Sequence, residues 1–99
     1  KKIIVMPCLI ELGPASKEVH KKIGKKIAEV CDSAIITTVD WFKEIEVSAT
    51  ENGMKKENIL FIPNSQKIIE KLRQEIKSGG AVLFEGRIEK KIIEDTKCF

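Results

Sequence analysis

The fold of this chain is decided by a short apolar run, Ile3-Ile4-Val5-Met6, and by the helical pattern that follows it over 16–30. The run is continuous and largely β-branched, which is typical of a strand that is covered on both faces. Over 16–30 the apolar residues recur at helical spacing, and Ser16 is a plausible N-cap. The inward positions expected for this helix are Val19, Ile23, Ile27 and Val30. This stretch therefore predicts a strand followed by an amphipathic helix.

The same pairing of a strand and a helix recurs along the rest of the chain. Strands are expected over 3–6, 34–36, 59–62 and 81–84, and their continuous apolar runs predict that all four are covered on both faces. Helices are expected over 16–30, about 40–53, about 64–78 and about 88–94. Parallel strands joined by helices require right-handed crossovers, which place helices on both sides of a twisted sheet. We therefore predict an α/β fold, a Rossmann-like three-layer α/β/α sandwich with a mainly parallel sheet of at least four strands.

The composition describes one small domain. The chain has 99 residues, and 18 Lys and Arg against 15 Asp and Glu leave a formal net charge of +3. Both signs are interspersed, whereas a nucleic-acid interface usually gathers its positive charge on one face, so no nucleic-acid partner is expected. The apolar runs are too short to span a bilayer, and no membrane association is expected. Because Lys1 directly precedes a strand, we expect a single domain over 1–99 that is part of a longer polypeptide.

The cysteines and the missing phosphate motifs narrow the chemistry. Cys8, Cys31 and Cys98 are an odd number without metal-ligand spacing, which indicates a reducing cytoplasm and no metal site. No G-x-G-x-x-G follows the first strand, where Pro7 and Pro14 remove backbone donors, and no G-x-x-x-x-G-K-[ST] occurs anywhere. The chain is therefore a poor candidate for a nucleotide enzyme that acts alone.

Ligands of such sheets bind at the carboxyl ends of the strands, near the point where the strand order reverses. The loops expected there are 7–16, 37–40, 63–65 and 85–87. Cys8 lies in the first of these loops. It is either a nucleophilic thiolate or, as a small hydrophobe without a nearby cation, a packing residue, and the second reading is favoured.

Four further residues are candidates for contact with a ligand. His20 lies one turn inside the first helix, where it is either a half-exposed surface imidazole or part of the site. Glu11 is an acid between apolar neighbours in the first loop, and a turn-stabilising carboxylate is its alternative role. Gly86 and Arg87 follow the fourth strand, and the planar fork of an Arg suits a carboxylate or a phosphate; Arg87 is otherwise a solvated residue at the start of a helix.

The first loop and helix carry a family resemblance. The loop 5–13 contains Glu11-Leu12-Gly13, and the helix contains His20-x-x-Ile23-Gly24. This resembles the C-terminal domain of the Mur ligases, with a G-D-M-x-E-L-G loop and a His-x-x-hydrophobic-Gly helix, and the branch that adds D-alanyl-D-alanine to the UDP-muramoyl tripeptide is the most similar. The segment 80–87 is similar to the family's G-D-V-V-L-x-K-G-S-R, and the resemblance extends from about residue 3 to 94. Pro7-Cys8 and Glu85 depart from the pattern, which indicates a divergent member.

The resemblance implies an ATP-dependent amide ligase of peptidoglycan precursor synthesis in the cytoplasm. In such an enzyme ATP phosphorylates a carboxylate, and an incoming amine attacks the acyl phosphate. ATP and Mg²⁺ are then held mainly by a central domain, and a UDP-muramoyl peptide is bound by an N-terminal domain. The present domain is expected to bind the incoming amino acid or D-alanyl-D-alanine, to close over the ATP site, and to be inactive in isolation.

By this resemblance the substrate-binding residues are Glu11, His20, Gly86 and Arg87, with Arg87 on a substrate carboxylate. No catalytic residue, no metal ligand and no cofactor of its own is expected in this domain. Two alternatives from other classes stay open. One is a stand-alone α/β binding domain or phosphocarrier that uses Cys8, and the other is an interaction module without a ligand.

Overall fold

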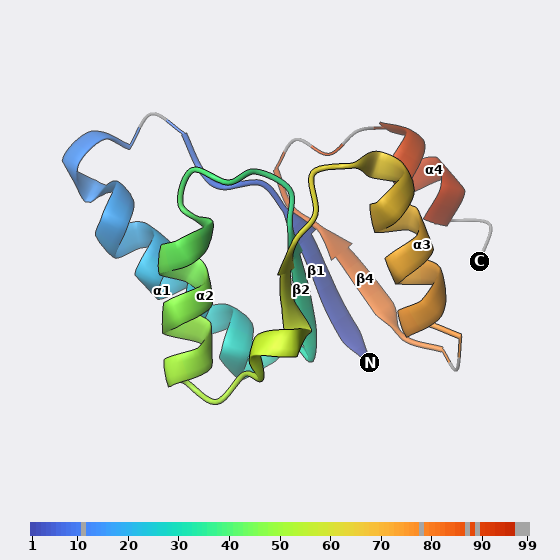
Figure 1. Cartoon of the computed structure of the whole chain (residues 1–99), viewed down its shortest axis with the longest axis horizontal. Coiled ribbons are helices and arrows are strands. Elements are labelled where there is room, and N and C mark those ends of the chain that lie inside the picture. Colours follow the sequence, from blue (N-terminus) through green and yellow to red (C-terminus); the bar gives the residue numbers. More distant parts are fainter. Residues whose placement is uncertain (11, 78, 87, 89, 97–99) are drawn as a thin grey trace.

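The computed structural model describes residues 1–10, 12–77, 79–86, 88 and 90–96, which form a parallel sheet with helices on both faces (Figure 1). The strands are β1 (Lys2–Met6), β2 (Ser33–Ile36), β3 (Ile59–Phe61) and β4 (Ala81–Phe84). The helices are α1 (Ser16–Val30), α2 (Phe42–Glu51), α3 (Ser65–Glu75) and α4 (Lys90–Thr96). Strands and helices alternate along the chain, which confirms the predicted fold class. None of the helices in these described ranges is long and apolar enough to cross a membrane.

The strand order in the sheet is β3-β2-β1-β4, with every neighbouring pair parallel. The chain adds β2 and β3 on one side of β1 and then returns to add β4 on the other side. The strand order therefore reverses beside β1, and this switch point lies where the loops after β1 and β4 meet. The chain leaves each of the four strands at the upper edge of the sheet in Figure 1.

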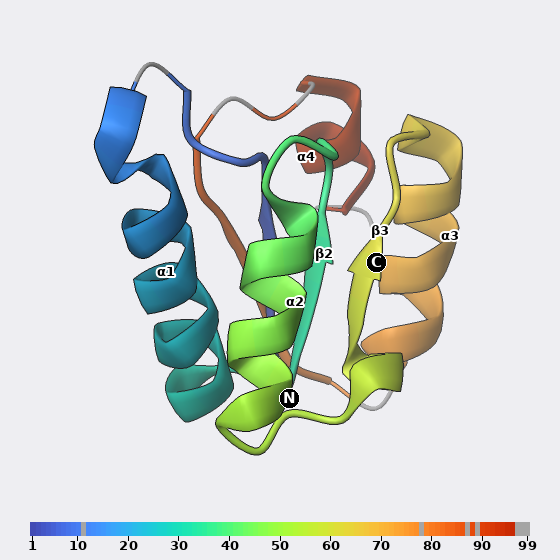
Figure 2. The same cartoon turned by 60° about the vertical axis from the view of Figure 1, so that its left-hand side comes forward.

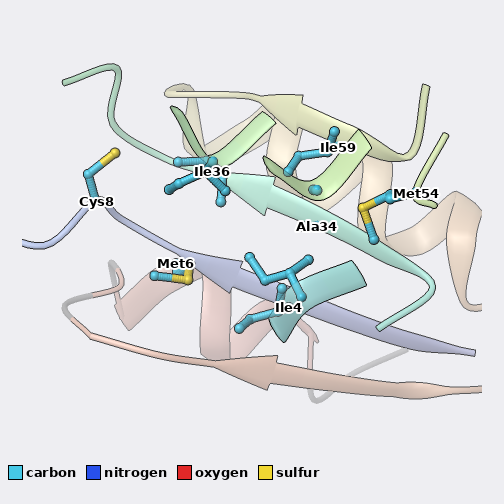
Figure 3. Close-up of a cluster of buried hydrophobic side chains, with 10 residues drawn as sticks. Ile4, Met6, Cys8, Ala34, Ile36, Met54 and Ile59 are labelled. Atoms are coloured by element: carbon cyan, nitrogen blue, oxygen red, sulfur yellow. The ribbon is translucent and has the colours of Figure 1, made fainter. Parts of the chain in front are cut away.

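Two cores lie on opposite faces of the sheet because successive side chains of a strand alternate. Ile4 and Met6 of β1 face α1 and α2, which lie side by side in Figure 2, whereas Ile3 and Val5 face α3 and α4. The first core is completed by Cys8, Ile27, Ala34, Ile36, Ile45, Ala49, Met54 and Ile59, most of which are drawn in Figure 3. The second core is completed by Ile35, Ile68, Ile69, Leu72 and Ile92.

Strand β4 corrects the prediction that the strands are covered on both faces. Val82 and Phe84 pack against the second core, but Leu83, on the other face, is 51% exposed. The reason is that β4 is an edge strand. On the face of α1, a hollow separates Leu83 from Ile27 and Val30 of that helix.

Helix α1 confirms part of the predicted inward face, since Ile27 is buried and Ile23 packs against the first core, and corrects the rest. Its buried residues are Ser16, His20, Gly24 and Ile27, whereas Val30 is 48% exposed. The helix follows a 3-10 turn over Gly13–Ala15, so Ser16 is not the N-cap; that position is Ala15, which makes no side-chain capping bond. The rotation of the buried face arises because α1 packs closely on α2 as well as on the sheet.

Candidate functional site

A cavity of about 630 Å³ opens at the carboxyl ends of β1, β2 and β4. It lies at the switch point of the sheet, which is where open α/β sheets bind ligands. Its lining comes from the loop after β1, from the two residues after β2 and from the turn after β4. The lining residues are Pro7, Cys8, Leu9, Ile10, Thr37, Thr38 and Gly86.

Cys8 joins the loop after β1 to the segment after β2. Its N–H donates to Thr38 Oγ1 at 2.8 Å, and its thiol donates to the Thr38 carbonyl oxygen at 3.4 Å. The Trp41 N–H donates to Cys8 Sγ at 3.3 Å. Figure 3 shows the sulfur just beyond the end of β1, turned toward the segment that follows β2. With 3% of its surface exposed, Cys8 acts as a packing residue, and this arrangement does not present a nucleophile to a ligand.

His20 supports the same loop from behind. Its Nε2 accepts a hydrogen bond from the Leu9 N–H at 3.0 Å, and its Nδ1 lies 2.6 Å from the Ser16 carbonyl oxygen. An amide N–H only donates and a carbonyl oxygen only accepts, so the ring is neutral with its hydrogen on Nδ1. The ring also stacks on Trp41, with centroids 5.4 Å apart and planes 14° apart. His20 is completely buried, which corrects the expectation of a half-exposed surface imidazole.

Gly24 explains how His20 reaches Trp41. It lies one turn after His20 on the same face of α1, where a Cβ would come within 2.5 Å of the Ile45 carbonyl oxygen and 2.9 Å of Ser48 Cβ. Only a residue without a side chain allows α1 and α2 to approach this closely. The close approach is fixed by the Ser48 hydroxyl, which donates to the Lys21 carbonyl oxygen at 2.5 Å.

Gly86 brings the turn after β4 against the loop after β1. The Glu85 N–H donates to the Val5 carbonyl oxygen at 3.1 Å, which extends the pairing of β1 and β4 to the cavity. Gly86 then adopts a φ of +75°, and a Cβ there would lie 3.1 Å from Pro7 Cδ. Both the left-handed backbone and the contact with the proline ring favour glycine at this position.

The four predicted site residues differ in their positions relative to the cavity. Gly86 lines the cavity, and His20 holds the cavity loop without reaching the lining. Glu11 and Arg87 lie outside the described residues. Sequence reasoning gave no role to Thr38 and Trp41, which hold Cys8 and His20. The available signals were that Thr38 lies in the expected loop 37–40 and that Trp41, the single tryptophan of the chain, lies at the start of a predicted helix.

Two ionisable groups whose pKa is shifted, Cys31 and Glu75, lie away from the cavity. Burial, with a further contribution from Asp32, raises the pKa of the Cys31 thiol at the far end of α1, while Lys2 opposes the shift. Hydrogen bonds from Lys1 and Lys71 lower the pKa of Glu75. Among the residues that the structure describes, no group of three or more His, Cys, Asp and Glu side chains is placed to hold a metal ion.

The comparisons with known proteins agree with this architecture. MurF from Acinetobacter baumannii has a TM-score of 0.70 at 19% sequence identity, and the likeness covers 96% of this chain and 22% of that chain. The MurF ligase from Thermotoga maritima, solved in complex with ADP, has a TM-score of 0.62 at 28% identity, with 98% and 21% covered. The chain thus spans about a fifth of the length of these structures. No curated protein sequence matches it significantly.

The family model described as "Mur ligase, glutamate ligase domain" matches residues 1–88. This match includes β1 to β4, the cavity and the helix that carries His20. The chain belongs to the Mur ligase family, in which it corresponds to the C-terminal domain.

Proposed function

We propose that this chain is the C-terminal domain of an ATP-dependent amide ligase of peptidoglycan precursor synthesis, where it binds the incoming amino acid or D-alanyl-D-alanine. Membership of the Mur ligase family and the likeness to two MurF structures support this proposal. In the proposed enzyme, residues 1–99 form one domain of a longer cytoplasmic polypeptide, the other substrate is a UDP-muramoyl peptide, and the domain is inactive on its own.

The observation that carries the proposal is the cavity at the switch point. Its volume of about 630 Å³ falls in the range of about 300–1,000 Å³ that is usual for small-molecule sites. Pro7, Leu9 and Ile10 give it apolar walls, and Thr37 adds a hydroxyl group. Such a lining suits a small dipeptide with methyl side chains. A domain that closes with this face over an acyl phosphate would also exclude water from that reactive group.

The residues of this domain do not fit a phosphate-binding loop for ATP. After β1, position 7 is a proline without an N–H, and the next two N–H groups are already bound, Cys8 to Thr38 and Leu9 to His20. A phosphate cradle needs several free backbone donors at this point of the chain. We therefore assign ATP and Mg²⁺ to another part of the enzyme and derive no step through them here.

The substrate carboxylate needs a cation, and Arg87 directly follows the cavity residue Gly86 in the sequence. A guanidinium there would donate two parallel hydrogen bonds to that carboxylate. Glu11 directly follows the cavity residue Ile10 in the sequence and is proposed as a second substrate contact. Both roles rest on the resemblance and on these neighbours in the sequence.

A charge at the mouth of the cavity tests the proposal without disturbing the core. Ile10 lines the cavity and is 74% exposed, so its substitution leaves the fold intact. The reacting dipeptide is the free amine and carries a net negative charge. In the full-length ligase, Ile10→Glu should therefore raise the KM for D-alanyl-D-alanine about tenfold, a loss of about 1.4 kcal/mol of binding, and leave the KM for ATP unchanged.

Ile10→Gln is the matched control, because it has the same size and polarity without the charge. It should keep the KM for the dipeptide close to that of the wild type. Equal KM values for the Glu and Gln variants would show that the cavity does not bind the amine substrate. A reading frame without a G-K-[ST] loop upstream of this domain would contradict the ligase assignment itself.

A further inference from the structure

The loop that forms the near wall of the cavity is held by side chains rather than by strand pairing. Strand β1 ends at Met6, and the next two donating N–H groups go to Thr38 Oγ1 and to His20 Nε2. The Thr38 bond fixes Cys8 against the segment after β2. The His20 bond is one residue further along and fixes Leu9, which lines the cavity.

The imidazole of His20 is itself rigidly placed. Its other nitrogen donates to the Ser16 carbonyl oxygen at 2.6 Å, and its face lies on Trp41. The backbone N–H of Trp41 in turn donates to Cys8 Sγ at 3.3 Å, so the His20 ring, the loop after β1 and the start of α2 form a closed set of contacts. A side chain held from three directions transmits its position to whatever it binds.

We propose that His20 is a positioning residue, whose Nε2 sets the place of Leu9 and so the shape of the amine-binding cavity. This inference rests on the proposed function of the cavity. It gives His20 a role in substrate affinity that involves no contact with the substrate, since the side chain is completely buried. His20 acts through the hydrogen bond to the Leu9 N–H, and the stacking on Trp41 keeps the imidazole ring in the orientation that this bond needs.

Two substitutions separate the two nitrogens of the ring. In His20→Gln the amide lies at the ε position, where its oxygen can accept from the Leu9 N–H. In His20→Asn the amide lies at the δ position, where it can reach only Ser16. Both variants lose the stacking on Trp41, so their difference isolates the bond to Leu9. Asn52→Ala is the control for packing, because it removes a side-chain hydrogen bond to the Ser48 carbonyl oxygen at the C-terminal end of α2, away from the loop.

The first measurement is the steady-state kinetics of the full-length ligase with D-alanyl-D-alanine. We expect His20→Asn to raise the KM for the dipeptide about tenfold with little change in kcat, as for the loss of binding shared by ground and transition states. His20→Gln should recover most of this loss, and Asn52→Ala should keep the wild-type KM. Equal KM values for the Asn and Gln variants would overturn the inference, as would a loss confined to kcat.

The second measurement is the hydrogen exchange of the Leu9 amide in the 99-residue chain, followed by NMR. This amide should exchange faster in His20→Asn than in His20→Gln, while amides of α1 common to both variants exchange alike. Equal exchange rates of Leu9 in the two variants would overturn the inference even if KM changes. A wild-type ligase without turnover that depends on D-alanyl-D-alanine would instead refute the proposed function, and the exchange rates would still decide whether His20 holds the loop.

Discussion

The two ends of α1 lie in contrasting surroundings. Near its start, His20 is completely buried, and both of its ring nitrogens are hydrogen bonded inside the domain. At its end, Val30 is 48% exposed beside a hollow of about 330 Å³, and Leu83 of β4 is 51% exposed across it. A polar side chain thus belongs to the core and an apolar one to the surface. The contrast shows that burial along this helix follows from contacts with neighbouring elements and not from the hydrophobicity of each side chain.

The candidate site lies over the end of α1 that contains His20. The cavity loop is bound to α1 through His20 and to the segment after β2 through Thr38. The hollow at the other end is apolar but has no comparable set of hydrogen bonds among the described residues. The predictions that follow test this difference between the two ends, in order of decreasing effect.

The largest effect is expected where α1 and α2 touch. In Gly24→Val a Cβ would approach the Ile45 carbonyl oxygen to 2.5 Å, so the helices must separate. Overpacking of this kind costs about 3 kcal/mol of unfolding free energy at the upper end of the usual range. Urea unfolding measures the change, and the exposed neighbour Lys25→Val serves as the control. A Gly24→Val protein as stable as the control would show that the close approach is not required.

The next effect compares two neighbouring residues on the same face of the sheet, one on β1 and one on the edge strand β4. Ile4 of β1 and Leu83 of β4 are register partners, yet Ile4 is 8% exposed and Leu83 is 51% exposed. Ile4→Thr buries a hydroxyl and loses packing, which should cost about 2 kcal/mol. Leu83→Thr should change stability by less than about 0.5 kcal/mol. Similar losses for both variants would mean that the hollow beside β4 is closed in solution.

The smallest effect lies at the amino ends of the strands, away from the cavity. Lys1 and Lys71 hold Glu75 and lower its pKa below the ordinary value of 4.5. A carboxylate with a lowered folded-state pKa contributes stability above its ordinary pKa and loses it as the pH falls through the lowered value. Glu75→Gln should therefore cost at most about 1 kcal/mol at pH 7.

This difference between wild type and Glu75→Gln should vanish at a pH below the lowered pKa. Chemical unfolding at pH 7, 4.5 and 3 gives the profile, and the exposed Glu70→Gln on the same helix should show none of it. A stability difference that stays constant down to pH 3 would contradict the ion-paired arrangement of Glu75.

The elements of the fold were predictable because their signals are local. Helix α3, for example, begins at Ser65 directly after Asn64, whose side chain accepts from the Lys67 N–H, as an N-cap should. The run 59–62 predicted β3 one residue too long, although the Ile62 N–H still donates to the Ile36 carbonyl oxygen at 3.0 Å. Helix α4 begins at Lys90 rather than at residue 88.

The candidate site was predictable only in part because its contacts join distant positions. The loop after β1 and Gly86 follow from the rule that ligands bind at the carboxyl ends of strands. The burial of His20 depends on Trp41, which follows it by a whole strand and loop. The exposure of Val30 depends on how α1 packs on α2, and that of Leu83 depends on β4 being an edge strand. Hydrophobic periodicity carries no information about helix packing or strand order.

The central claim is that the cavity after β1 binds the amine substrate, and hydrogen exchange with mass spectrometry on the full-length ligase tests it most directly. Saturating D-alanyl-D-alanine should slow exchange in peptides that cover 7–10 and 37–38, and leave a peptide confined to the end of α1 unchanged. L-alanyl-L-alanine is the control and should protect neither. Protection by D-alanyl-D-alanine that falls wholly outside 7–10 and 37–38 would contradict the claim.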